Sequence, residues 1–198
     1  MSASGVDVRR HILEVAHPLL VRKGFSAVGL AEVLEAAQVP KGSFYHYFGS
    51  KESFGEALLE AYFTDCLARM DDLLSKRGTS AQRLVAYFRD WLESQTEADA
   101  QQRCLVVKLG AEVCDLSENM RAVLDRGTQR IVARIAVSIE AGKKDGSVKT
   151  SLDAQTAAVT LYQSWLGASL LAKITRDRAP LDTAMSSTRR MLGMTRTG

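Results

Sequence analysis

The chain has 198 residues, of which 46% are hydrophobic and 25% are charged. This composition is ordinary for a globular protein and supplies enough apolar material for a core without a disulfide or metal staple. The three cysteines show no CxxC or Cys/His spacing, and no stretch approaches the roughly 18 apolar residues of a membrane span. The N-terminus also lacks the layout of a signal peptide. We therefore predict a cytosolic protein with no membrane partner, no metal site and no cofactor.

The net charge is +3, from 26 basic and 23 acidic residues, which by itself indicates no particular partner. Residues 1–51 are slightly more basic, with six Lys or Arg against four Asp or Glu. They also hold all three histidines, His11, His17 and His46. Because no histidine follows residue 46, the rest of the chain lacks the usual base for cysteine catalysis. We expect a protein that is not an enzyme and has no catalytic residues.

Apolar residues recur at helical spacing along almost the whole chain, and no segment alternates as a strand would. Ser50 suits the N-cap of a long helix, and Pro180 suits a helix start. We interpret the segment from Gly142 to Gly146 as a solvated turn. The predicted helices cover 6–23, 30–37, 40–48, 50–76, 80–97, 102–114, 117–141, 152–176 and 180–192. The predicted fold class is all-α.

The segment from Gly24 to Phe54 has the dimensions of a helix-turn-helix. Two short helices are joined by a turn at Gln38-Val39-Pro40. Phe44 and Phe48 are four residues apart in the second helix and are expected to lie in the core. The same helix carries an unusual set for packing alone, namely Lys41, Gly42, Ser43, Tyr45, His46 and Tyr47.

This set suits contact with DNA. Lysines neutralise phosphates, and the hydroxyl and imidazole groups can donate hydrogen bonds to them. Lys41 and Tyr47 can also reach base edges in the major groove. Gly42 lowers helix stability but lets another backbone approach closely, and the free amides at this helix end suit a phosphate. The alternative interpretation is an aromatic packing helix with a solvated polar face.

The run from Gly24 through Val39-Pro40 to Ser50-Lys51-Glu52 resembles the signature of the TetR family of repressors. Carried over by position, the base-facing residues are Lys41 and Gly42, and the phosphate-contacting residues are Ser43, Tyr45, His46 and Lys51. The resemblance implies a nine-helix fold. A three-helix helix-turn-helix DNA-binding domain would cover 1–49, and a larger helical ligand-sensing and dimerisation domain would cover 50–198.

The sequence departs from that signature at two positions. Gly29 stands where the family usually has Ser or Thr as the cap of the second helix, although Glu32 keeps the capping-box position. Gln38 replaces the usual glycine of the turn. Glycine is a tolerable N-cap, so we still expect the fold and DNA binding.

Two residues are out of character in the second part of the chain. Cys104 precedes an apolar run, and at a helix start the amide dipoles and Arg103 would lower the pKa of its thiol. Lys173 is the only charged residue between Asp153 and Arg176. The alternatives are a small buried cysteine and a lysine that reaches solvent near a helix end. We expect Cys66 and Cys114 to be small buried hydrophobes.

The later segments resemble an electrophile-responsive subgroup of the TetR family. The similar segments are Cys104 to Arg121, Leu161-Tyr162, Trp165 to Leu170 and Ala172 to Ile174. The resemblance implies that Cys104 is the sensing thiol and Lys173 a nearby partner. The remaining candidate ligand residues are the aromatic Trp91, Tyr162 and Trp165. Arg103 departs from the glycine that the subgroup tends to have.

We expect a homodimer that binds a near-palindromic double-stranded DNA operator through one recognition helix per subunit. The helices at 152–176 and 180–192 would pair with those of the partner. Small residues would allow their close approach: Ala157, Ala158, Gly167, Ala168 and Ser169. Modification of Cys104 by an electrophile or oxidant would release the DNA. The alternative is induction by reversible, non-covalent binding of a small apolar ligand.

Overall fold

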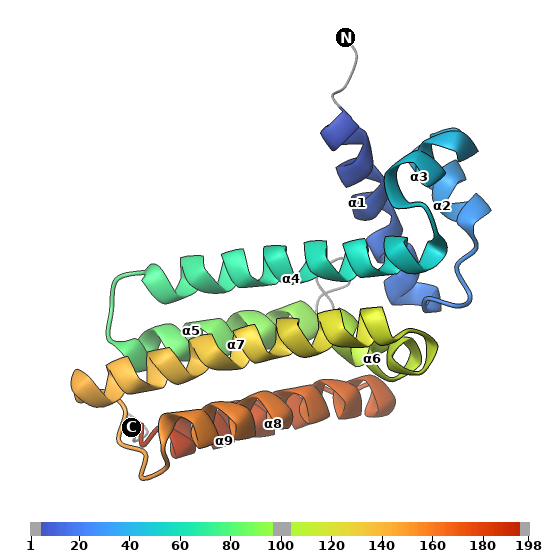
Figure 1. The fold of residues 1–198 in the computed structure, drawn as a ribbon. Coiled ribbons are helices and arrows are strands. Elements are labelled where there is room, and N and C mark those ends of the chain that lie inside the picture. Colours follow the sequence, from blue (N-terminus) through green and yellow to red (C-terminus); the bar gives the residue numbers. More distant parts are fainter. Residues whose placement is uncertain (1–4, 97–103, 195–198) are drawn as a thin grey trace. The chain divides into compact units, whose positions relative to one another are not determined.

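The computed structural model describes residues 5–96 and 104–194, and in these ranges it contains nine helices and no strand (Figure 1). The helices are α1 (Gly5–Lys23), α2 (Leu30–Ala37), α3 (Lys41–Phe48), α4 (Lys51–Ser75), α5 (Ser80–Thr96), α6 (Leu105–Leu116), α7 (Glu118–Lys144), α8 (Ala154–Thr175) and α9 (Ala179–Met191). The all-α prediction is confirmed, and most predicted bounds lie within two residues of those observed. None of the helices in this part of the chain is long and apolar enough to cross a membrane.

The largest differences in bounds, three residues each, lie at the start of α6 and at the end of α7, which continues through the predicted turn to Lys144. Gly142 is helical and lies against Val148, where a Cβ atom would clash with the valine side chain. Gly146 makes the turn instead, with a φ of +75° that favours glycine. The prediction of a turn beginning at Gly142 is therefore wrong, because this glycine serves close packing and not a change of direction.

The helix starts follow local capping chemistry. The Ser50 hydroxyl accepts a hydrogen bond from the backbone amide of Ser53 at 3.0 Å, which is the cap expected for α4. The Asp153 carboxylate accepts one from the amide of Thr156 at 2.9 Å at the start of α8. Each bond satisfies a backbone amide that the helix leaves unpaired.

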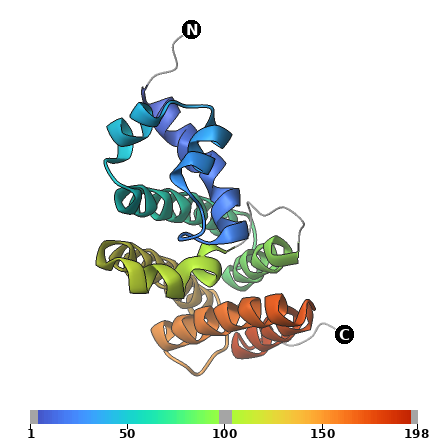
Figure 2. The same ribbon diagram turned by 90° about the vertical axis from the view of Figure 1, so that its right-hand side faces the viewer.

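The chain divides into two compact units. Unit 1 comprises 1–64 and 98–127, and unit 2 comprises 65–97 and 128–198, so the division passes within α4 and α7. Unit 1 has its own buried core, which includes Ile12, Leu20, Phe44, Phe63 and Leu109. In unit 2, α8 and α9 lie side by side in both views (Figures 1 and 2). The predicted domain boundary after residue 49 stays a prediction.

Candidate nucleic-acid interface and sensor thiol

The turn between α2 and α3 has a left-handed residue at its centre. Gln38 ends α2 with φ 55° and ψ 40°, and its amide donates to the carbonyl of Glu35 at 3.1 Å. A residue with a Cβ atom is disfavoured in this conformation, which explains why a glycine is usual in such a turn. His11 of α1 lies against the same end of α2, with its Nε2 3.1 Å from the carbonyl of Ala37. The departure at position 38 therefore keeps the turn geometry but places a side chain where glycine is favoured.

α3 has one buried aromatic face. Phe44 and Phe48 are buried, as predicted, and their ring centroids lie 5.2 and 5.1 Å from that of Phe54 at the start of α4. The opposite faces hold the predicted DNA-contacting set. Lys41, Gly42, Tyr45 and His46 are exposed, and Ser43 and Tyr47 are half-buried. The aromatic face thus anchors α3 and leaves a polar, basic surface available.

Among residues 5–96 and 104–194, no contact requires glycine at position 42. A Cβ atom built there would lie more than 4 Å from every described atom outside its chain neighbours and the backbone of its own helix turn, and the backbone φ is not positive. Gly29, at the N-cap of α2, also has open space where a Cβ atom would lie, and as a glycine it gives α2 no side-chain capping bond. The absence of a side chain at Gly42 therefore leaves the first turn of α3 accessible to a close external partner.

The Lys51 ammonium group contacts two residues of the loop that follows α1. Its Nζ lies 3.4 Å from the carbonyl of Ser26 and 5.1 Å above the ring of Phe25. An ammonium group has three donors, so contact with Ser26 leaves capacity for a phosphate. The structure thus assigns Lys51 a structural contact that the sequence did not indicate.

Cys104 is the N-cap of α6 and is half-buried. The Tyr62 hydroxyl, from α4, lies 3.5 Å from its sulfur. Burial raises the pKa of the Cys104 thiol, and the hydrogen bonds from Tyr62 and from the amides of Val107 and Val106 offset only part of that effect. The expected lowering of this pKa is therefore wrong, because desolvation outweighs the amides. Arg103 lies outside the described residues.

Tyr62 is a neighbour of the thiol that sequence reasoning missed. It lies 42 residues before Cys104 on a different helix, so no local spacing could have revealed the contact. Its ring also lies near that of His17 on α1, with 6.1 Å between the centroids. The other two cysteines differ from expectation in exposure. Cys66 is half-buried and Cys114 is exposed, so Cys114 is not a buried hydrophobe.

The three predicted aromatic ligand residues form one packed cluster in unit 2. The ring centroid of Trp91 lies 5.8 Å from that of Trp165 and 5.7 Å from that of Tyr162. Both indole groups donate to buried hydroxyls, that of Trp91 to Ser169 at 3.1 Å and that of Trp165 to Thr188 at 2.9 Å. Satisfied donors and full burial are typical of core aromatics. These residues belong to unit 2, whereas Cys104 belongs to unit 1.

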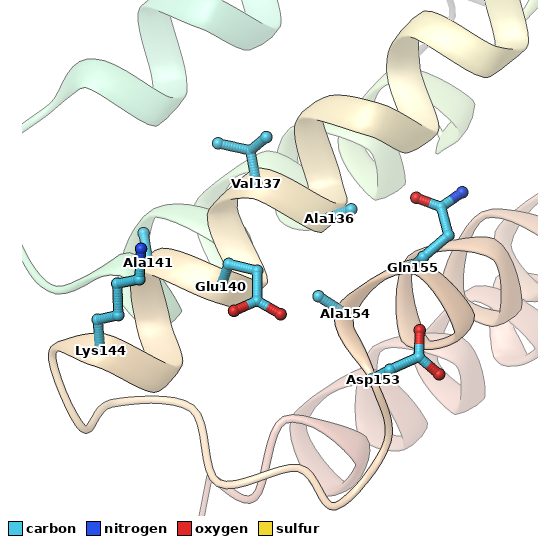
Figure 3. Close-up of a pocket in the computed structure, with 8 residues that line it drawn as sticks. All are labelled: Ala136, Val137, Glu140, Ala141, Lys144, Asp153, Ala154 and Gln155. Atoms are coloured by element: carbon cyan, nitrogen blue, oxygen red, sulfur yellow. The ribbon is translucent and has the colours of Figure 1, made fainter.

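Lys173 also belongs to unit 2, where it lies exposed in the last turn of α8. Its predicted pairing with Cys104 stays a prediction. Unit 2 has a groove of about 590 Å³ between α7 and the start of α8, lined by side chains from both (Figure 3). None of the predicted sensor residues lines this groove. Glu140, Lys144 and Asp153 supply its charged groups.

The small residues of α8 mostly face inward. Ala157, Ala158, Ala168 and Ser169 are buried within the protomer, so they cannot provide the close approach to a partner that we expected. Gly167 alone of that set is exposed. The exposed apolar residues lie further along the helix, with Leu170 48%, Leu171 52% and Ile174 66% exposed. These three residues form the exposed apolar stripe of α8.

Comparison with known proteins gives matches at both ends of the chain. Residues 12–58 match the family of bacterial regulatory proteins described as tetR, and residues 80–188 match a tetracyclin repressor-like C-terminal domain. The transcriptional repressor NemR of Escherichia coli K12 is 40% identical over 187 residues, which are 94% of each chain. The repressor DhaR of Mycobacterium sp. GP1 is 34% identical over 88% of this chain and 87% of that protein.

A solved structure extends this similarity to the fold. The crystal structure of the reduced form of E. coli NemR matches with a TM-score of 0.90 at 39% identity, covering 96% of this chain and 100% of that one. The similarity to NemR thus extends along nearly the whole chain, in sequence and in fold.

Proposed function

We propose that this chain, which belongs to the TetR family of bacterial transcription regulators, is a repressor that leaves its operator when an electrophile or oxidant modifies Cys104. Its relatives are transcriptional regulators and not enzymes. In this proposal residues 1–49 bind DNA, and residues 50–198 sense the signal and form the homodimer. The observation that carries the proposal is the position of Cys104, which caps a helix in the same compact unit as α2 and α3.

DNA binding is supported by the division of α3 into two faces. The phenylalanines fix the helix in unit 1, while Lys41, Gly42, Tyr45 and His46 are exposed together on one short helix. A recognition helix reads the major groove with residues near its N-terminus. The open space around Gly42 suits the close approach of a phosphate to free backbone amides.

Dimerisation is supported by the exposed apolar stripe on α8. Contiguous exposed apolar residues are costly in water and commonly mark an interface. Covering Leu170, Leu171 and Ile174 with the same face of a second copy would form a symmetric dimer. Two recognition helices related by a two-fold axis require a near-palindromic operator, with half-sites about 34–36 Å apart.

The sensing step is addition of the Cys104 sulfur to an electrophilic carbon. The thiol first loses its proton, and the thiolate sulfur bonds to the β-carbon while the C=C electron pair moves toward the carbonyl oxygen. The resulting enolate takes up a proton, at the α-carbon for an unsaturated aldehyde; the adduct of a quinone instead becomes a hydroquinone, with its protons on the oxygens. The thiolate is the attacking species, so the raised pKa of Cys104 limits the rate at neutral pH. We therefore expect strong electrophiles to act faster than weak ones. The solved relative was crystallised in a form named as reduced, which supports redox chemistry in that protein.

The DNA-binding part of the proposal is tested with a duplex that the wild-type protein selects from random sequence. Fluorescence anisotropy would compare Lys41→Ala and Gly42→Ala with Lys76→Ala, a control that removes an exposed lysine beyond the end of α4. We expect Lys41→Ala to bind about fivefold more weakly or worse, as for loss of one good contact. Gly42→Ala should weaken binding without lowering the melting temperature, because its methyl group meets open space.

Lys76→Ala should bind like the wild type. Affinity unchanged in both α3 variants would remove α3 as the reading helix. A release that leaves the mass of Cys104 unchanged would favour a reversible ligand over covalent modification.

A further inference from the structure

We propose that Glu112 of α6 is the positioning residue that couples the helix capped by Cys104 to the DNA-reading helices. The inference rests on the proposed function, because the coupling has a role only if release begins at Cys104. Cys104, Glu112, α2 and α3 all lie in unit 1.

Glu112 holds two consecutive backbone amides of the segment that joins α1 to α2. Its Oε2 accepts a hydrogen bond from the amide of Phe25 at 3.0 Å, and its Oε1 accepts one from the amide of Ser26 at 2.7 Å. Hydrogen bonds to a charged carboxylate are stronger and more directional than neutral ones. Because both bonds are made to backbone amides, the loop contributes no side chain to this contact, and the Glu112 side chain joins α6 directly to the loop backbone.

The sequence of the loop is adapted to this carboxylate. Gly24 has a φ of +92°, which favours glycine, and a Cβ atom placed there would lie 3.0 Å from Oε2 of Glu112. Glycine therefore both permits the turn after α1 and leaves room for the Glu112 side chain.

Further contacts join α6 to the same part of the unit. Lys108, one turn before Glu112, donates to the carbonyl of Arg22 at the end of α1 at 3.4 Å. The Ser117 hydroxyl, at the C-cap of α6, donates to the carboxylate of Glu52 in the first turn of α4. α6 therefore contacts the end of α1, the loop and the start of α4, with Glu112 at the centre of this row.

The Glu112 carboxylate is ionised at neutral pH. Burial acts to raise the pKa of this carboxyl, but the hydrogen bonds from Ser26 and Phe25 and the charge of Lys108 together lower it. A bidentate, ionised acceptor tolerates little displacement, because hydrogen bonds weaken steeply with length and angle.

These contacts give a physical route from the thiol to α2. An adduct enlarges the half-buried Cys104 at the N-cap and displaces the first turn of α6. Glu112 lies eight residues further on, about 12 Å along the same rigid helix. A shift of α6 therefore moves the loop through Glu112, and the loop moves α2 and α3.

The test measures coupling and not only affinity. In a Cys66→Ala, Cys114→Ala background, Cys104 is alkylated with iodoacetamide, with loss of iodide and of the thiol proton, and checked by intact mass. Affinity for the selected duplex is then measured before and after alkylation. We expect alkylation to weaken binding by about 5- to 150-fold in this background, the usual range of allosteric coupling.

The variants Glu112→Ala and Glu112→Gln are compared with Asp115→Ala, which removes an exposed carboxylate from the same helix. In Glu112→Ala the ratio of the affinities before and after alkylation should fall below about twofold. In Glu112→Gln the ratio should lie between this value and that of the background protein, because an amide keeps one acceptor oxygen. Asp115→Ala should keep the full ratio. A full ratio in Glu112→Ala would overturn the proposal.

Hydrogen exchange separates this failure from failure of the proposed function. Alkylation should speed amide exchange over residues 30–48 in the background protein and leave it unchanged in Glu112→Ala. If exchange responds but affinity does not, release through Cys104 is refuted while the coupling stands. If exchange over 30–48 does not respond in the background protein, the coupling itself is refuted.

Discussion

At Cys104, burial and hydrogen bonding act on the thiol in opposite directions. Burial raises its pKa, and the Tyr62 hydroxyl and two backbone amides stabilise the thiolate. The unmodified thiol is therefore mostly protonated at neutral pH. Such a thiol reacts slowly with weak electrophiles, because little of it is present as the nucleophilic thiolate.

Removing the Tyr62 hydroxyl should make Cys104 less reactive. Tyr62→Phe deletes a donor to the thiolate, so the pKa of the thiol should rise further, by up to about one unit. Alkylation at pH 7 should then slow by about threefold to tenfold. The pH dependence of iodoacetamide alkylation, followed by intact mass, measures both. Tyr45→Phe, which alters an exposed tyrosine on α3, is the control. An unchanged or faster rate in Tyr62→Phe would show that the hydroxyl does not stabilise the thiolate.

The direction of this pKa could not be predicted from sequence. The helix start and its amides are local and were foreseen, whereas desolvation depends on which distant residues pack around the sulfur. The contact with Tyr62 joins residues that are 42 positions apart. Nothing in the sequence around either residue indicates that the two side chains meet.

At the scale of elements, the helix-turn-helix was the most predictable part of the chain. α2 has the predicted bounds and α3 differs by one residue at its start, because local turn chemistry and apolar spacing specify them. The buried positions of Phe44 and Phe48 follow from the same spacing. The small residues of α8 were less informative. Helical spacing identifies a face of small residues, but it cannot say whether the protomer's own core or a partner covers it.

The left-handed turn residue gives a prediction of stability. Gln38→Gly should stabilise the protein by about 0.5–1 kcal/mol, because glycine has no Cβ penalty at φ 55°. For a chain of this size that corresponds to a melting temperature higher by about 1–4 °C. Gln38→Ala, which keeps a Cβ atom, should show no such gain. A lower melting temperature for Gln38→Gly than for the wild type would contradict the inferred strain.

At the scale of the whole molecule, the exposed stripe on α8 predicts how copies associate. Ile174→Asp places a charge at the most exposed residue of the stripe and should convert the dimer to a monomer. Light scattering after size exclusion should then give half the wild-type mass. Leu116→Asp, which changes an exposed leucine of α6, should remain a dimer. A dimeric Ile174→Asp with unchanged dissociation would place the interface elsewhere.

A monomeric variant should also lose most of its operator affinity. Each subunit presents a single α3, so one half-site contact would remain and the second would no longer be held nearby. DNA binding and dimerisation are therefore linked through the distance between two recognition helices.

The central claim is that modification of Cys104 releases the operator. Its most direct test follows two quantities in one sample as a quinone is added: the fraction of duplex bound, by anisotropy, and the fraction of Cys104 modified, by peptide mass. We predict that bound duplex falls in parallel with Cys104 modification, and that Cys104→Ser binds the duplex normally but is not released. Normal release of Cys104→Ser, or wild-type protein that stays bound with Cys104 fully modified, would contradict the account.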